Sequence, residues 1–175
     1  MRRSGRRGGR VDNALKIISA TDDVARHLSI TALAIRIEAD ALDAARLTAR
    51  RADPAATRVR SERIRAAVDG AVARIARADG SHRPVFTLFQ TLIGAQLSRI
   101  PGPADPGLWD QVATHELAGP FLAGYARLQQ AAGLLTHRRR REATIALREA
   151  EAAAGRLSAV PMHAEIAAPR LPGSP

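Results

Sequence analysis

Cysteine is absent from this sequence, and its absence removes several kinds of chemistry at once. Without thiols the chain cannot form disulfides, supply a thiolate nucleophile or bind zinc through sulfur. This composition agrees with a cytoplasmic protein, and we expect that location. The sequence also lacks any run of about 18 apolar residues, so it contains no candidate membrane-spanning helix, and we expect no membrane partner.

Aromatic residues make up only 3% of the chain, whereas 46% of it is apolar, and much of that fraction is alanine. Alanine has the highest intrinsic helix propensity, so the composition favours an all-α fold. A length of 175 residues suits one domain with a substantial core. We expect the centre of that core in the span that contains every aromatic residue, namely Phe86, Phe89, Trp109, Phe121 and Tyr125.

Lysine is almost missing, because Lys16 is the single lysine among 27 basic residues. The net charge of +10 is therefore carried by arginine, and such a charge fits a protein that attracts nucleic acid. A GC-rich genome also produces arginine in place of lysine, together with abundant alanine, without selection for binding. Composition alone leaves both interpretations open.

Proline and glycine divide the chain into segments with helical periodicity. Asp105 places a capping carboxylate directly before Pro106 at the first helical position, and Pro120 can begin a helix in the same way. Gly119 is suited to end the preceding helix. No segment alternates with the period of a strand. We predict helices near 22–51, 55–79, 84–99, 106–118, 120–136 and 138–157, and a short helix after Pro161.

The helices are expected to form one folded region with a segment on either side. Two apolar stripes run along the predicted helix 84–99, so this helix should be buried on several sides. We assign residues 1–20 to a basic, disordered N-terminal arm and residues 21–168 to a helical repeat domain. Residues 169–175 form a proline-rich, disordered tail in this assignment.

The last predicted helix pair has the spacing of a tetratricopeptide repeat. Ala131, Leu134, Ala143, Leu147 and Ala150 follow the pattern small-x2-large-x8-Ala-x3-large-x2-Ala. Small residues at these positions let two helices approach closely, while the larger ones fill the grooves between them. The spacing predicts antiparallel helix pairs stacked as a short tetratricopeptide-like α-solenoid.

Two longer stretches carry a resemblance to a known family. The segments LWDQVATHELAGPFLAGYARLQQAAGLL (108–135) and REATIALREAEAAAGRLSAVPMHAEI (141–166) resemble the helical-repeat region of large LuxR-type transcriptional regulators. The segment 30–56 resembles the preceding repeat of that family. His115 replaces a second tryptophan of the family, and THRRRR (136–141) replaces its Gly-Asp-Arg turn. The matching positions are Trp109 and residues 116–121, 125–127, 134–135, 146–150, 159–162 and 164–166.

The resemblance implies a scaffold or a sensor of protein or ligand inside a larger regulator. In that family an ATPase precedes the repeats and a helix-turn-helix follows them. This sequence has no G-x-x-x-x-G-K-[ST] phosphate loop and no helix-turn-helix after Ile166, where Pro169 and Pro172 oppose further helix. We therefore expect a truncated segment whose exposed repeat faces bind a protein partner or a second copy. A working fragment and the remnant of an interrupted gene have the same sequence features.

The sequence contains no catalytic or metal-binding pattern. Its five histidines form neither H-x-x-x-H nor H-E-x-x-H, and no G-x-S-x-G elbow supplies a nucleophile. Glu142 is interpreted as the ion-pair partner of Arg138 at i,i+4. We predict that the chain is not an enzyme and that it binds no cofactor and no metal.

Arg138, Arg139, Arg140 and Arg141 are the candidate nucleic-acid contacts. Consecutive arginines can bind phosphates with salt-dependent affinity, but we interpret this block first as the solvated turn of a repeat. At the start of a helix they oppose the macrodipole, so helix stability does not explain them. No aromatic side chains accompany them for stacking on bases. The alternative function is therefore a small basic helical protein that binds nucleic acid non-specifically.

Overall fold

The computed structural model describes residues 24–47, 59–60, 62–66, 69–70, 73 and 83–157. All regular structure in these ranges is helical, which confirms the predicted all-α class for this part of the chain. The chain falls into two compact units, Met1–Ile100 and Pro101–Pro175, so the repeat domain expected over 21–168 spans both. The arm 1–20, the tail 169–175 and the helix expected after Pro161 lie outside the described residues.

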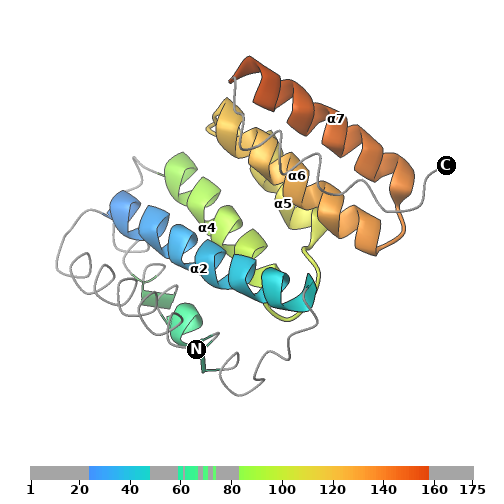
Figure 1. Cartoon of the computed structure of the whole chain (residues 1–175). Coiled ribbons are helices and arrows are strands. Elements are labelled where there is room, and N and C mark those ends of the chain that lie inside the picture. The colour runs from blue at the N-terminus through green and yellow to red at the C-terminus, as the bar shows by residue number, and fades with distance from the viewer. Residues whose placement is uncertain are drawn as a thin grey trace. The chain divides into compact units, whose positions relative to one another are not determined.

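In the first unit α2 (Val24–Leu47) packs against α4 (Arg83–Ser98), as Figure 1 shows. Both helices lie where the sequence predicts them, with small differences at their ends. Leu28 and Ile35 of α2 are fully buried in their contact. The predicted burial of α4 on several sides is confirmed by its buried residues, Phe86, Leu88, Leu92, Ile93, Ala95 and Gln96.

The helix predicted over 55–79 is described only in part. Residues 59–60, 62–66, 69–70 and 73 are helical. Arg60 Nε contacts Glu38 Oε2 of α2 at 3.1 Å, so this segment lies against α2 at that point. Both side chains are partly exposed, and the pair therefore contributes little to stability.

The second unit contains α5 (Pro106–Thr114), α6 (Pro120–Thr136) and α7 (Arg140–Arg156). α6 packs against both other helices (Figure 1). The predicted cap at the start of α5 is confirmed, because an Asp105 carboxylate oxygen accepts hydrogen bonds from the amides of Gly107 at 2.8 Å and Leu108 at 3.3 Å. This cap satisfies two amides that have no partner inside the helix.

The end of α5 differs from the prediction of residue 118. His115 has φ −65° and ψ 134°, so the backbone leaves the helix directly after Thr114. The His115 Nδ1 atom accepts a hydrogen bond from the Leu117 amide at 3.2 Å, which fixes the turn that follows. Gly119 does not end this helix. It is instead the N-cap of α6, before Pro120 at the first helical position.

The core of the second unit is built around Trp109, which is fully buried. Its ring meets Tyr125 edge to face, with 5.6 Å between centroids and 83° between planes. The Trp109 Nε1 donor has no acceptor among the described residues. The prediction that all aromatics mark one core centre is wrong for Phe121, which is 56% exposed, and Phe86 belongs to the first unit.

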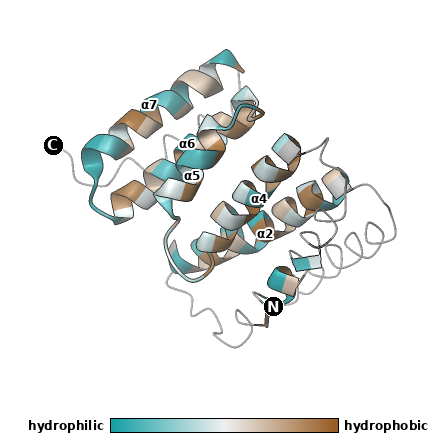
Figure 2. Ribbon diagram, turned by 180° about the vertical axis from the view of Figure 1, so that it is seen from behind, coloured by the Kyte–Doolittle hydropathy of each residue, from teal (hydrophilic) through white to brown (hydrophobic). Residues whose placement is uncertain are grey.

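The contact between α6 and α7 follows the repeat spacing. Ala131, Leu134, Ala143 and Ala150 are buried, and Leu147 packs against the same cluster. Residues 137–139 join the two helices and reverse the chain direction (Figure 1). Figure 2 shows hydrophilic and hydrophobic residues alternating along α7, because one face of this helix is buried and the other is exposed.

None of the helices within the described ranges is long and apolar enough to cross a membrane.

Candidate functional site

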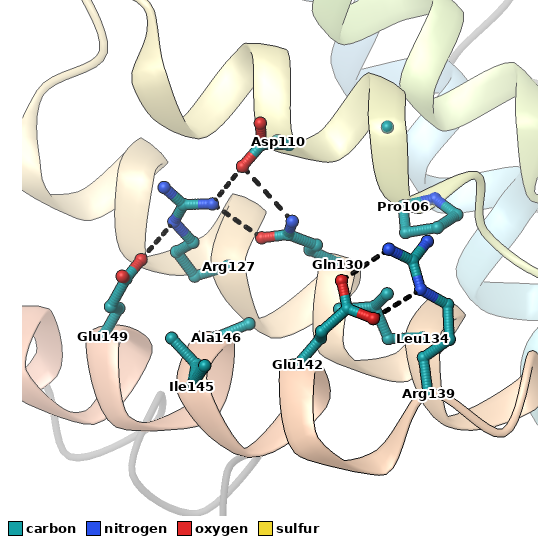
Figure 3. A pocket seen from close by; sticks show the side chains of 11 residues that line it. Pro106, Asp110, Arg127, Gln130, Leu134, Arg139, Glu142, Ile145, Ala146 and Glu149 are labelled. Carbon is teal, nitrogen blue, oxygen red and sulfur yellow. Dashed lines mark hydrogen bonds and ion pairs between the residues drawn. The ribbon is translucent and has the colours of Figure 1, made fainter.

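An open groove of about 450 Å³ lies on the second unit, with α6 as its floor and α5 and α7 along its sides (Figure 3). α5 contributes Pro106, Gly107 and Asp110, and α6 contributes Arg127, Gln130 and Leu134. Arg139 precedes α7, which contributes Glu142, Ile145, Ala146 and Glu149.

Arg127 occupies the centre of the groove and connects its three helices. The Arg127 Nη1 atom donates hydrogen bonds to Asp110 of α5 and to Gln130 of α6, the latter at 2.7 Å. Its Nε atom pairs with a Glu149 carboxylate oxygen of α7 at 2.5 Å. The Arg127 side chain is only 19% exposed, whereas both carboxylates are about half exposed. The network therefore combines a shielded cation with solvated anions.

Arg139 and Glu142 form a second ion pair at the end of the groove. The Arg139 Nε and Nη2 atoms donate to the two Glu142 oxygens at 2.7 and 2.5 Å. This bidentate hydrogen bond lowers the pKa of Glu142 and raises that of Arg139. The predicted pairing of Glu142 with Arg138 is therefore wrong, because the turn before α7 directs Arg139 toward Glu142.

The groove neutralises its own charges, since each of its arginines already binds carboxylates. Its apolar surface is small and lies at Leu134, Ala146 and Ile145, the last 57% exposed. An arrangement of this kind stabilises the packing of three helices. It offers a ligand no unpaired arginine.

Arg138 has the geometry of a helix-ending residue that is usually glycine. Its φ is 60°, in the left-handed region. The Arg139 amide donates to Leu134 O at 2.9 Å and the Arg138 amide donates to Leu135 O at 3.0 Å. These two bonds form a Schellman motif, in which Arg138 occupies the position that favours glycine.

The four candidate arginines do not share one environment. Arg138 lies in the turn, Arg139 is the N-cap residue of α7, and Arg140 and Arg141 lie in the first turn of α7. All four are exposed. Only Arg139 has a carboxylate partner among the described residues. The structure therefore separates one neutralised arginine from three that face solvent.

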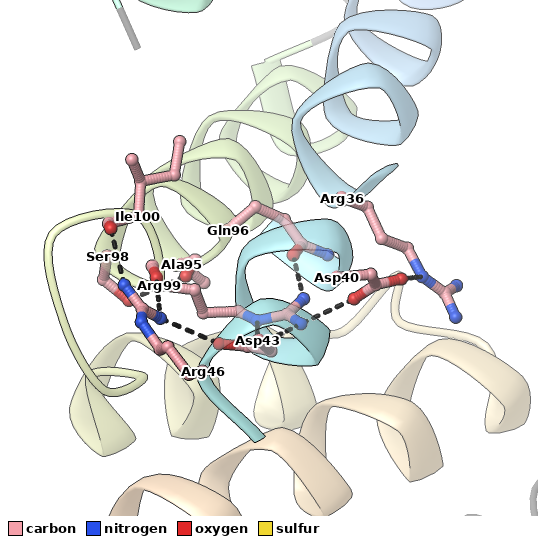
Figure 4. A network of polar contacts seen from close by, with 9 residues as sticks. All are labelled: Arg36, Asp40, Asp43, Arg46, Ala95, Gln96, Ser98, Arg99 and Ile100. Carbon is pink, nitrogen blue, oxygen red and sulfur yellow. Dashed lines mark hydrogen bonds and ion pairs between the residues drawn. The ribbon is translucent and has the colours of Figure 1, made fainter. Parts of the chain in front are cut away.

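A second polar network lies in the first unit, where it joins α2 to the end of α4 (Figure 4). The buried Arg99 side chain donates to Asp43 Oδ2 at 2.7 and 3.1 Å, to Asp40 at 2.5 Å and to Gln96 at 2.8 Å. Arg46 of α2 donates to Asp43 and to the carbonyls of Arg99 and Ile100. Arg46 thus satisfies carbonyls that follow α4.

Neither network was predicted from the sequence. The carboxylate partners of Arg127 are 17 and 22 positions away, and those of Arg99 on α2 are more than 50 positions away. The available signal was a charged residue within an apolar stretch, as for Arg127 between Ala126 and Leu128. That signal indicates a partner but does not identify it.

No group of three or more histidine, cysteine or acidic side chains that could hold a metal ion occurs within the described ranges. His27 is buried in α2, His115 lies in the turn after α5, and His137 is exposed at the end of α6. The candidate surfaces of the second unit are therefore the groove and the exposed arginines of α7.

Comparisons with models of protein families, with curated proteins and with solved structures found no match to this chain.

Proposed function

We propose that this chain is a non-catalytic, tetratricopeptide-like repeat segment that acts as a scaffold or sensor in a LuxR-type transcriptional regulator. The observation that carries this proposal is the contact between α6 and α7. Four small or medium residues at the repeat spacing, Ala131, Leu134, Ala143 and Ala150, are buried there. In a solenoid, each such helix pair packs against its neighbours and presents its remaining surface to a partner.

The surface of the second unit supports a role in binding protein. Leu117, in the turn before α6, and Phe121, in the first turn of α6, are 45% and 56% exposed. Large apolar side chains on a surface are typical of contacts with other proteins when they form a patch. The partner is a second copy of the chain or another protein, and the proposed location is the cytoplasm.

The regulator assignment is tested by reading the DNA on both sides of the coding region in all three forward frames. We expect a G-x-x-x-x-G-K-[ST] phosphate loop upstream and a helix-turn-helix pattern downstream. Flanking sequences without either pattern would reject the LuxR-type context. The helical module would then be a protein with a role of its own.

A second candidate function is non-specific binding of nucleic acid. The observation that favours it is the exposure of Arg138, Arg140 and Arg141, none of which pairs with a carboxylate in the described part of the chain. Binding of this kind weakens steeply as salt increases, whereas a protein-packing module retains little DNA at any salt concentration.

A further inference from the structure

We propose that the outer face of α7 forms a phosphate-binding ridge that continues from the turn before it, and that the ridge binds the backbone of duplex DNA without reading its sequence. The ridge consists of Arg138, Arg140, Arg141, Arg148 and Arg156. The inference rests on the second candidate function. It adds Arg148 and Arg156 to the binding surface, places that surface along the axis of α7, and specifies duplex DNA as the ligand.

The arginines of the second unit divide into two groups by location. Arg127 and Arg139 line the groove and bind carboxylates. The five arginines of the ridge are exposed and have no carboxylate partner among the described residues. Two acidic side chains lie on the groove side of α7. Glu142 pairs with Arg139, and Glu149 pairs with Arg127. Glu151 is also exposed between Arg148 and Arg156, so the five arginines and this one carboxylate leave a net positive charge on the outer side for an external anion.

Positions along α7 place Arg141 and Arg148 on its outer face. The residues buried against α6 include Ala143, Ala146 and Ala150, so the opposite face of the helix points away from the unit. Arg141 and Arg148 are seven residues apart and fall on nearly the same line, about 10 Å from each other along the axis. Arg156 extends the exposed charge to about 22 Å from Arg141.

The conformation of Arg138 gives a second, independent argument. A non-glycine residue at a left-handed helix end is less stable than glycine at the same position. Arg140 and Arg141 also lie in the first turn of α7, where a cation opposes the macrodipole. The arginines thus lower local stability, and contact with an anion explains them better than folding does.

Side chains between the arginines indicate the form of nucleic acid. The exposed residues of this face include Thr144, Ile145, Glu151 and Ala152, and none is an aromatic that could stack on an unpaired base. None is an asparagine or glutamine that could read adenine. A rigid row of cations without stacking or base-reading groups suits the regular phosphates of a duplex.

The test measures binding of the full chain to a labelled duplex of about 20 base pairs by fluorescence anisotropy, between about 50 and 200 mM salt. If about five arginines contact phosphates, the affinity falls several hundred-fold over this range. The double variant Arg148→Gln/Arg156→Gln should reduce the salt slope by about 2 and weaken binding about 50-fold near 0.1 M salt. Arg148→Lys/Arg156→Lys should retain most of the slope, because lysine also contacts phosphate.

The matched control is Arg26→Gln/Arg65→Gln, which removes the same charge from exposed positions of the first unit. It should change the slope much less than the ridge variant does. Equal effects of the two pairs would show general charge attraction, which rejects the ridge and retains the nucleic-acid function. Absence of salt-dependent binding by the unaltered chain rejects both. Stronger binding to single strands than to the duplex also rejects the ridge as described.

Discussion

At the scale of single residues, the energy of the turn between α6 and α7 is set by Arg138. The Schellman bonds at this turn require a left-handed residue, and φ at Arg138 is 60°. An L-residue with a side chain brings its Cβ close to a carbonyl oxygen in this conformation, whereas glycine does not. At position 138 the backbone conformation favours glycine, whereas the sequence has a positively charged arginine.

We predict that Arg138→Gly stabilises the second unit by about 0.5–1 kcal/mol, because relief of the left-handed strain exceeds the added flexibility of the unfolded chain. The measurement is urea unfolding followed by fluorescence of Trp109, the single tryptophan of the chain. The control is Arg148→Gly in the middle of α7, which should destabilise by about 1 kcal/mol. Equal losses of stability in both variants would contradict the assigned strain.

At the scale of elements, the segment before α5 packs closely against α6, where Ala104 approaches Gly133. A Cβ placed on Gly133 would lie 2.3 Å from the carbonyl oxygen of Ala104, which is backbone and cannot rotate away. Ala104 is itself buried beside α6. The segment before α5 and the helix α6 can therefore pack this closely only because residue 133 has no side chain.

We predict that Gly133→Ala destabilises the second unit by about 1–3 kcal/mol, because the forced displacement outweighs the better helix propensity of alanine. The matched control is Gly155→Ala in α7, where an added Cβ meets nothing within 4 Å. That variant should be neutral or more stable by up to about 1 kcal/mol. Urea midpoints from Trp109 fluorescence compare the two, and similar midpoints would disprove the close approach.

The contact of α2 with α4 depends on a buried cation. The Arg99 side chain is 4% exposed, and Asp43 supplies two of its hydrogen bonds while also accepting one from Arg46. The buried Arg99 guanidinium has lost its contacts with water, and the negative charge of Asp43 offsets part of that cost. Neutralising Asp43 removes this favourable interaction. The half-exposed Asp40 gives Arg99 a single contact and also pairs with Arg36 at 3.5 Å, so it is the weaker partner of Arg99.

We predict that Asp43→Asn destabilises the first unit by about 1–3 kcal/mol and that Asp40→Asn costs about 1 kcal/mol or less. Hydrogen exchange of the amides in α2 and α4 measures the loss of protection. Exchange of the amides in α7 should be unchanged and serves as the internal reference, because that helix belongs to the other unit. A larger loss of protection from Asp40→Asn than from Asp43→Asn would reverse the proposed roles.

At the scale of the whole molecule, exposed apolar residues determine how the chain behaves in solution. Burial of Leu117 and Phe121 against a second copy would remove apolar area from water, which is the main driving force for association.

We predict self-association whose extent rises with concentration in sedimentation velocity. Leu117→Gln/Phe121→Gln should shift the chain toward monomer, whereas Leu157→Gln, also exposed, should not. A monodisperse monomer over the full concentration range would disprove this association.

Local sequence patterns predicted much of the fold. Asp105 and Pro106 begin α5 as expected, because a cap needs only residues near it in the chain. The burial of Ala131 and Ala143 followed from their spacing. The end of α5 was missed, since His115 leaves the helix through its own backbone angles and a contact with Leu117. The helical signal in the sequence continued beyond this point.

The sequence by itself determined the helical class, the start of α5 and α6, and the packed face of the α6–α7 hairpin, because each follows from a cap, a periodicity or a repeat spacing along the chain. Only the tertiary structure decided which arginines are neutralised. Arg127 and Arg99 find carboxylates on helices distant in the chain, whereas Arg141 and Arg148 meet none among the described residues. The physical reason is that an ion pair forms at a few ångströms, and only packing brings groups so far apart in sequence to that distance.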